Sequence, residues 1–130
     1  MKKRVILLLA GFLVCLPMLF AQEVPNALVM AFKKGNSQEL GKYWGNEVEL
    51  VIQKRTERAD KRTATNKMAR FFSGNRVSDF RVNHQGKRDE SSFIVGTLTT
   101  ANGKFRVNCF FKKTGDKYLI HQIRIDKTNE

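Results

Sequence analysis

Cysteine and proline are scarce in this 130-residue sequence, which contains two residues of each. Cys15 lies in an apolar run near the start of the chain, and Cys109 lies near the end. If the segment that contains Cys15 is removed, Cys109 is the only cysteine left. No intramolecular disulfide can then form, and the fold must be stabilised by packing. The remaining cysteine and two histidines stand at unrelated spacings and make no metal motif, so we expect neither a metal site nor a cofactor.

A long hydrophobic span is also missing. The apolar run from residue 5 to residue 20 is shorter than the roughly 20 residues of a membrane-crossing helix and contains Pro17. It follows three basic residues, 2–4, and precedes a plausible cleavage point at Ala21/Gln22. This order predicts a secretory signal peptide over residues 1–21 and a periplasmic or secreted mature protein, with an uncleaved anchor as the alternative.

Acidic residues are few. The mature part, residues 22–130, is predicted to be a single domain. It carries 21 basic residues against 12 acidic ones, because three of the 24 basic residues precede it. Such a surplus concerns solubility and partners rather than fold.

Most of the net positive charge of the mature part lies between residues 54 and 76, where eight basic residues stand against two acidic ones. The beginning of this segment is expected to be a loop or a ragged hairpin. Two interpretations remain open. The run is either a solvated charged face or a site for anionic lipid, polysaccharide or another acidic surface, which would use Arg55, Arg58 and Arg62.

Helical periodicity appears before and inside the basic segment. Apolar spacing predicts helices over 25–34, over about 36–44 with Asn36 as the N-cap, and over 65–73. Between them, alternation of apolar and polar residues predicts a strand over 47–52. Trp44 would then lie on the face of the second helix.

From residue 77 onward every segment resembles a strand, so we expect a four-strand meander. Asn102-Gly103 suits a type I′ turn, which would pair Leu98 with Val107 and Ile94 with Phe111. One face of this hairpin is apolar and is expected to pack on the helices. The opposite face gathers three apolar side chains that need a cover, namely Phe93, Val95 and Phe110.

The basic stretch GKFRVNCFFKK, residues 103–113, raises the possibility of nucleic-acid binding. Strand alternation, however, turns Phe105, Val107 and Phe111 toward the core and leaves Lys104 and Arg106 as ordinary outward residues. An RNA-recognition strand needs exposed aromatic residues. We therefore expect no nucleic acid as a partner.

The order helix, helix, strand, basic segment, helix and four antiparallel strands resembles the nuclear transport factor 2-like superfamily. More narrowly, the run from NKMARFF to HQIRID resembles a group of small exported bacterial proteins of unknown function. The resemblance implies an α+β fold, a conical roll in which a curved antiparallel sheet wraps N-terminal helices. It does not choose a chemistry, because the superfamily contains isomerases and dehydratases as well as binding proteins.

Enzymes of that superfamily place an acid or base inside the cone, and His121 is the one candidate that shares a face with apolar residues. An apolar-face histidine is more often a packing residue than a catalyst. Trp44 either lines a pocket mouth or, as is more common for a tryptophan on a helix face, packs in the core, and Cys109 is expected to be a buried packing residue. We therefore expect an exported binding or structural module that uses the cone interior or segment 54–76. The alternative is an isomerase or hydratase-like enzyme with His121 as its titrating group, acting on a small hydrophobic substrate.

The uncovered face of the sheet leads to a further expectation. Phe93, Val95 and Phe110 would pack against a second copy of the chain in a homodimer. The alternative is that the C-terminal tail or the curvature of the sheet hides them in a monomer. The connection TGDK leaves the last hairpin register open, so that His121 either joins this face or points into the cone.

Overall fold

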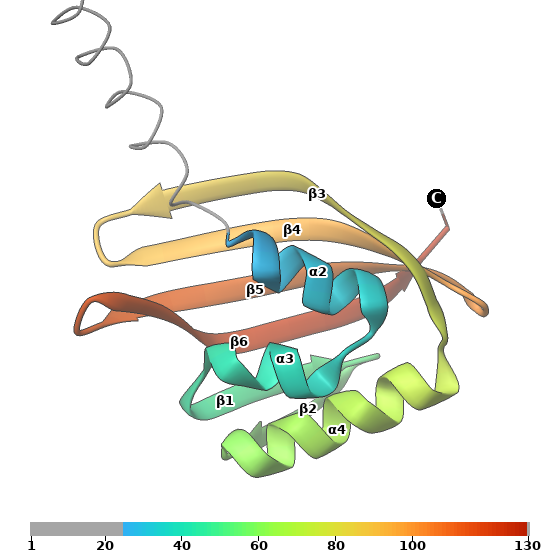
Figure 1. The fold of residues 1–130 in the computed structure, drawn as a ribbon, viewed down its shortest axis with the longest axis horizontal. Helices are drawn as coiled ribbons and strands as arrows, with labels where there is room; N and C mark the ends of the chain where they lie inside the picture. The colour runs from blue at the N-terminus through green and yellow to red at the C-terminus, as the bar shows by residue number, and fades with distance from the viewer. Residues whose placement is uncertain (1–24, 130) are drawn as a thin grey trace, which may run out of the picture.

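The computed structural model describes residues 25–129, and the expected signal peptide lies outside them. Figure 1 shows short helices lying across a long, curved sheet. The elements follow one another as α2 (Asn26–Lys34), α3 (Ser37–Leu40), a 3₁₀ turn η1 (Gly41–Tyr43), β1 (Trp44–Ile52), β2 (Arg55–Ala59), α4 (Lys61–Gly74), β3 (Val77–Arg88), β4 (Ser91–Thr100), β5 (Gly103–Thr114) and β6 (Lys117–Thr128).

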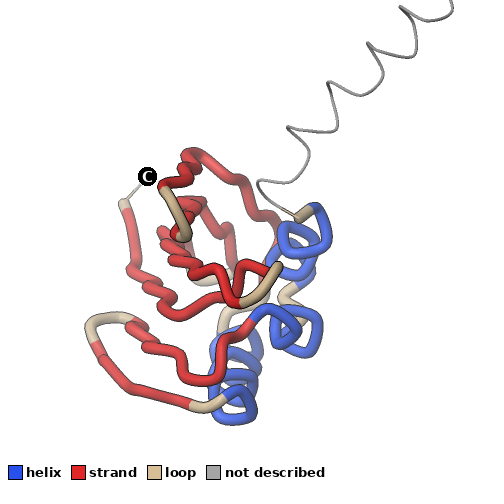
Figure 2. The backbone as a smooth tube through the Cα atoms, turned by 90° about the vertical axis from the view of Figure 1, so that its left-hand side faces the viewer, coloured by secondary structure: helices blue, strands red, loops and turns tan. Residues whose placement is uncertain are grey.

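The six strands form one sheet in the order β2-β1-β6-β5-β4-β3. Neighbouring strands are antiparallel, except that β1 runs parallel to β6. The helices gather on one side of the curved sheet, as Figure 2 shows. This is the α+β roll that the sequence predicts. The sheet side opposite the helices is called the outer face below.

The helices are held by local capping and by apolar stripes. Gly35 ends α2 in the left-handed conformation, at φ 59°, and its N–H donates to backbone oxygens of the last turn. Leu28 and Phe32 of α2 are fully buried, and α2 packs against β3. Helix α4 packs against β1 and α3.

Helix α4 begins earlier than the periodicity predicts. Asp60 is its N-cap, and its Oδ1 accepts a hydrogen bond of 2.8 Å from the backbone N–H of Thr63. This bond starts the helix at Lys61 instead of Thr65. The preceding basic residues form the hairpin strand β2, which pairs with β1 across a turn at Gln53 and Lys54.

The second predicted helix ends earlier than expected, before Trp44. Trp44 is the first residue of β1 and not part of a helix, because the 3₁₀ turn ends one residue before it. Its side chain is 1% exposed, within a core that the helices share with the inner sheet face. The central members of this core are Leu28, Phe32, Leu40, Trp44, Met68, Phe80, Leu98, Phe105, Ile120 and Ile123.

The register between β4 and β5 differs from the predicted one by two residues. Thr100 pairs with Gly103 and Leu98 with Phe105, so the turn residues are Ala101 and Asn102. The Thr100 hydroxyl accepts a bond from the Asn102 N–H and donates to the Gly103 oxygen, at 3.1 and 2.8 Å. A shift of two residues leaves every side chain on its predicted face, because the strand period is two.

The last hairpin combines both of the registers that the sequence leaves open. Thr114 pairs with Lys117 across a two-residue turn, and the pairing then shifts between Phe110 and Phe111. Phe111 faces Ile120 and Phe110 faces Gln122, so His121 is the extra residue of a β-bulge.

Candidate functional site

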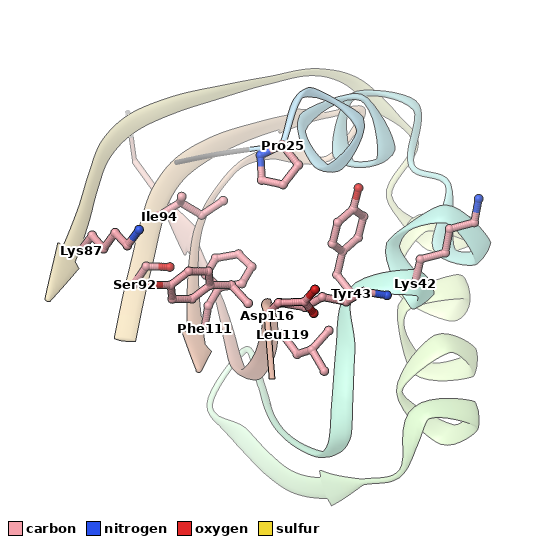
Figure 3. A pocket seen from close by; sticks show the side chains of 11 residues that line it. Pro25, Lys42, Tyr43, Lys87, Ser92, Ile94, Phe111, Asp116 and Leu119 are labelled. Atoms are coloured by element: carbon pink, nitrogen blue, oxygen red, sulfur yellow. The ribbon is translucent and has the colours of Figure 1, made fainter. Parts of the chain in front are cut away.

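A cavity of about 540 Å³ opens at one end of the roll, between the start of the helical layer and the ends of the long strands. Figure 3 shows the side chains around it, with Tyr43 pointing into the space. We call it the mouth cavity. Its lining comes from the N-cap of α2, from η1, from the β5–β6 turn and from four strands, and consists of Pro25, Lys42, Tyr43, Lys87, Ser92, Ile94, Phe111, Asp116, Lys117, Tyr118 and Leu119.

The floor of the mouth cavity is apolar. Ile94 on β4 and Phe111 on β5 lie on the inner face of the sheet, and their side chains are 2% and 5% exposed. Their side chains lie on the sheet side of the space in Figure 3. Such a floor favours the non-polar part of a ligand. The volume of the mouth cavity lies within the usual range for small-molecule sites.

The rim of the mouth cavity is polar and carries more cations than anions. Lys87 Nζ lies 5.0 Å from the centroid of the Tyr118 ring, a cation–π distance. Lys42 turns away from the centre in Figure 3 and pairs with Glu39 at 3.0 Å. Lys87 and Lys117 therefore remain as the rim cations, against the single carboxylate of Asp116.

Curvature is what brings Lys87 to Tyr118. The two residues lie on β3 and β6, which are separated in the sheet by β4 and β5. A flat sheet would hold them about 15 Å apart at the usual strand spacing. Sequence reasoning missed this pair and Ser92 because no local pattern marks which strand ends the curvature will bring together.

Trp44, predicted as a pocket residue, lies in the core and is not part of the mouth cavity lining. Its Nε1 donates a 3.1 Å hydrogen bond to the hydroxyl of Thr65, which in turn donates to the Lys61 carbonyl. The indole therefore joins β1 to α4. It acts as a packing residue with its one polar atom satisfied.

His121 is also absent from the mouth cavity lining. Burial and the nearby Lys112 lower the pKa of His121, while Glu49 has the opposite effect. Both charged neighbours alternate with core residues of their strands, so they lie on the outer face. The bulge thus places His121 on that face, with its Nδ1 shielded and without a hydrogen-bond partner among the described residues.

The three candidate arginines of the basic segment lie on two elements, Arg55 and Arg58 on β2 and Arg62 on α4. Arg58 pairs with Glu47 across the β1–β2 hairpin. Arg55 lies three residues before Arg58 on β2 and so on the opposite face of the strand. It lines a groove between the hairpin and α4. Arg62 is in the first turn of α4. The role of this segment as an anionic-surface site stays a prediction.

The apolar residues of the outer face lie together near its mouth end. Phe93 pairs directly with Phe110, and Val95 follows two residues along β4. Phe93 is 37% exposed, while Val95 and Phe110 are half-buried. The homodimer that these residues suggest stays a prediction.

Cys109 is fully buried in the inner sheet face, and burial raises the pKa of its thiol. Its thiol is thus held in the protonated form that suits packing and not nucleophilic attack. Among residues 25–129 no group of three His, Cys, Asp or Glu side chains is placed to hold a metal ion. No helix in that part of the chain is long and apolar enough to cross a membrane.

Comparison with known proteins gives a family over most of the domain. Residues 25–126 match the model of a family described as "Domain of unknown function (DUF4783)". A DUF4783 family protein of known crystal structure from Bacteroides ovatus ATCC 8483 is 62% identical. The match covers 84% of this chain and 99% of that one, with a TM-score of 0.81. No curated protein matches the chain.

More distant solved structures share the fold alone. A protein named "Rd1NTF2_04 with long sheet" is 14% identical, and the match covers 77% of this chain and 94% of that one at a TM-score of 0.64. A domain of unknown function with a cystatin-like fold from Nostoc punctiforme PCC 73102 is 8% identical. That match covers 80% and 72% of the two chains at a TM-score of 0.63. The resemblance to the nuclear transport factor 2-like superfamily is thereby confirmed at the level of fold.

Proposed function

This chain belongs to the DUF4783 family of domains of unknown function, and from that premise we propose that it is an exported binding module whose mouth cavity holds a small organic anion with an apolar body. The observation that carries the proposal is the cavity itself. Its apolar floor lies within reach of two lysines and two tyrosines at the rim.

The composition of the cavity supports this ligand class. Ile94 and Phe111 offer apolar surface, and Lys87 offers a positive charge at the edge of that surface. Ser92 and the tyrosine hydroxyls can donate hydrogen bonds to a carboxylate. A few convergent polar groups around a mainly apolar pocket are the usual composition of a small-molecule site.

Export is the second part of the proposal. The basic tripeptide and apolar run at the start of the sequence have the order of a secretory signal. The family match begins only at residue 25, after the expected cleavage point. N-terminal sequencing of protein recovered from the cell envelope should begin within a few residues of Gln22, whereas an intact Met1 would contradict export.

The alternative of an isomerase or hydratase-like enzyme depends on His121 as the titrating group, and the position of this residue favours binding instead. His121 lies on the outer face, away from the mouth cavity, and its pKa is lowered by burial there. The carboxylate at the rim, Asp116, lies in an exposed two-residue turn. We therefore retain binding as the proposed function.

The ligand class can be tested by NMR titration with two probes of equal size, an aromatic carboxylate and its uncharged amide. We expect the carboxylate to shift the backbone signals of Tyr43, Ser92 and Tyr118 and the amide to bind at least several-fold more weakly. Lys87→Gln should weaken carboxylate binding. Lys127→Gln, the same change at an exposed residue near the other end of the sheet, is the matched control. Shifts confined to other regions, or equal loss in both variants, would refute the proposal.

A further inference from the structure

A second groove, of about 530 Å³, crosses strands β3, β4 and β5 on the outer face. We call it the outer groove. The strand register places Arg81, Thr97 and Arg106 in one row across these strands, with Thr97 in the middle. Neighbouring strands lie about 4.8 Å apart, so both guanidinium groups can reach an anion held above Thr97.

The cations of the outer groove lack carboxylate partners. Lys104 lies two residues from Arg106 along β5 and adds a third positive charge. Within residues 25–129, none of the three forms an ion pair within 4.0 Å. Asp126, the register partner of Arg106 on β6, is held instead by Arg124 at 2.9 Å. The lining of the groove therefore contains three cations and no carboxylate.

Neutral hydrogen-bonding groups lie beside these charges. The Asn83 amide donates a 2.8 Å bond to the Thr97 hydroxyl oxygen, which leaves the hydroxyl hydrogen free to donate. Asn108 also lines the groove, and its Oδ1 has no hydrogen-bond partner among the described residues. This oxygen is shielded as the side chain stands, so Asn108 would have to turn toward the groove to accept a hydrogen bond from a ligand hydroxyl group, and that bond would satisfy the unpaired oxygen.

Charged donors for an acid group, next to an amide and a hydroxyl, suit a sugar that carries a carboxylate or sulfate. We propose that the outer groove is a binding site for an acidic saccharide. Sites for single-stranded nucleic acid combine positive charge with stacking aromatic rings, and the only ring in this lining is the imidazole of His84. The site is distinct from the mouth cavity, so its failure and that of the proposed function are independent.

The test uses isothermal titration of the mature protein with an oligogalacturonate tetramer and with galacturonic acid, which separates a polymer segment from a free sugar acid. Neutral dextran is the negative probe. The groove variant is Arg81→Gln/Arg106→Gln. The matched control is Lys34→Gln/Arg88→Gln, which removes the same charge from exposed residues that lie outside the groove and belong to no other candidate site.

We expect the groove variant to lose about tenfold or more in affinity for the tetramer and the control to lose less than about twofold, because only the first loses charge-assisted hydrogen bonds. Asn108→Ala should weaken tetramer binding while binding of inorganic polyphosphate, which has no sugar hydroxyls, stays unchanged. Equal losses in groove and control variants would overturn the proposal. So would single-stranded DNA binding as tightly as the tetramer, or the absence of binding at low salt.

Discussion

Two glycines of the sheet each lie beneath an aromatic ring, one on each face. A Cβ atom at Gly96 would stand 2.5 Å from Phe80 Cζ and 2.8 Å from the Arg81 carbonyl oxygen, inside the core. A Cβ atom at Gly86 would stand 2.4 Å from the ring of Phe93, which is 37% exposed. The buried ring and the backbone oxygen cannot move aside, whereas the exposed ring can rotate.

Gly96→Ala should therefore lower the free energy of unfolding by roughly 1–3 kcal/mol, the usual cost of overpacking a core. Gly86→Ala is the matched control and should have a smaller effect, because Phe93 can turn toward solvent. Urea unfolding of both variants measures the difference. The reverse order of the two losses would show that the inner face yields more easily than the outer one.

His121 should make stability depend on pH. Burial and Lys112 lower the pKa of His121 in the folded state below its ordinary value of 6.5. As the pH falls below that value, the unfolded chain takes up a proton that the folded chain does not, so the folded state loses stability. We expect the free energy of unfolding to fall less between about pH 7 and pH 5 in His121→Gln than in the wild type. Lys112→Gln should lie between them, and equal slopes in all three proteins would contradict this account.

At the scale of elements, the β4–β5 hairpin is tied to the end of α4. The Asn102 amide donates to the Gly74 oxygen at 2.7 Å and to the Asn75 side chain at 2.9 Å. The pattern Asn102-Gly103 predicts a turn at these two residues, but the turn occurs one residue earlier. Asn102 is therefore recruited for a tertiary contact that no local pattern announces.

Asn102→Ala should destabilise the protein by about 1–2 kcal/mol, since it removes two hydrogen bonds. Asn102→Gly separates the two possible causes in chemical denaturation. Glycine supports tight turns as well as asparagine does, but it cannot donate to α4. We expect it to be as destabilised as the alanine variant, and recovery of wild-type stability would show that turn conformation is what matters.

The helices and strands could be predicted from the sequence where local patterns, such as strand alternation and helix capping, determine them. The faces of β4 and β5 are correct despite the shifted register, because a two-residue shift conserves alternation. The start of α4 was missed, although Asp60 is a favoured N-cap residue, because the run of basic residues suggested a loop or a ragged hairpin. The bulge at His121 lies within the β5–β6 hairpin, and the sequence left its direction open because the TGDK connection allows more than one register.

At the scale of the whole molecule, the outer face divides into two parts. Phe93 and Phe110 lie toward the mouth end, and the outer groove lies toward the β4–β5 turn. Val95 lies at the boundary, because it follows Phe93 along β4 and also lines the outer groove. Figure 2 shows no helix on this side of the sheet in the described residues. The mouth cavity lies on the opposite side, so a ligand in it and a partner on the outer face would not compete.

The apolar part of the outer face predicts a homodimer in solution. Light scattering at micromolar concentration should give the mass of two chains, and Phe110→Asp should give a folded monomer because it buries a charge in the interface. Thr99→Asp, at the far end of the same face, is the control and should stay dimeric. A wild-type monomer would remove the interface.

Native mass spectrometry of mature protein purified from its host tests the central claim, that the mouth cavity is a ligand site. Ser92→Trp provides the comparison, because the larger side chain would fill the cavity beside Ile94 and Phe111. We expect the wild type to carry a small bound molecule that ionises as an acid and the filled variant, folded to the same extent, to lack it. A wild type without any bound molecule, or the same molecule retained equally by both proteins, would contradict the account.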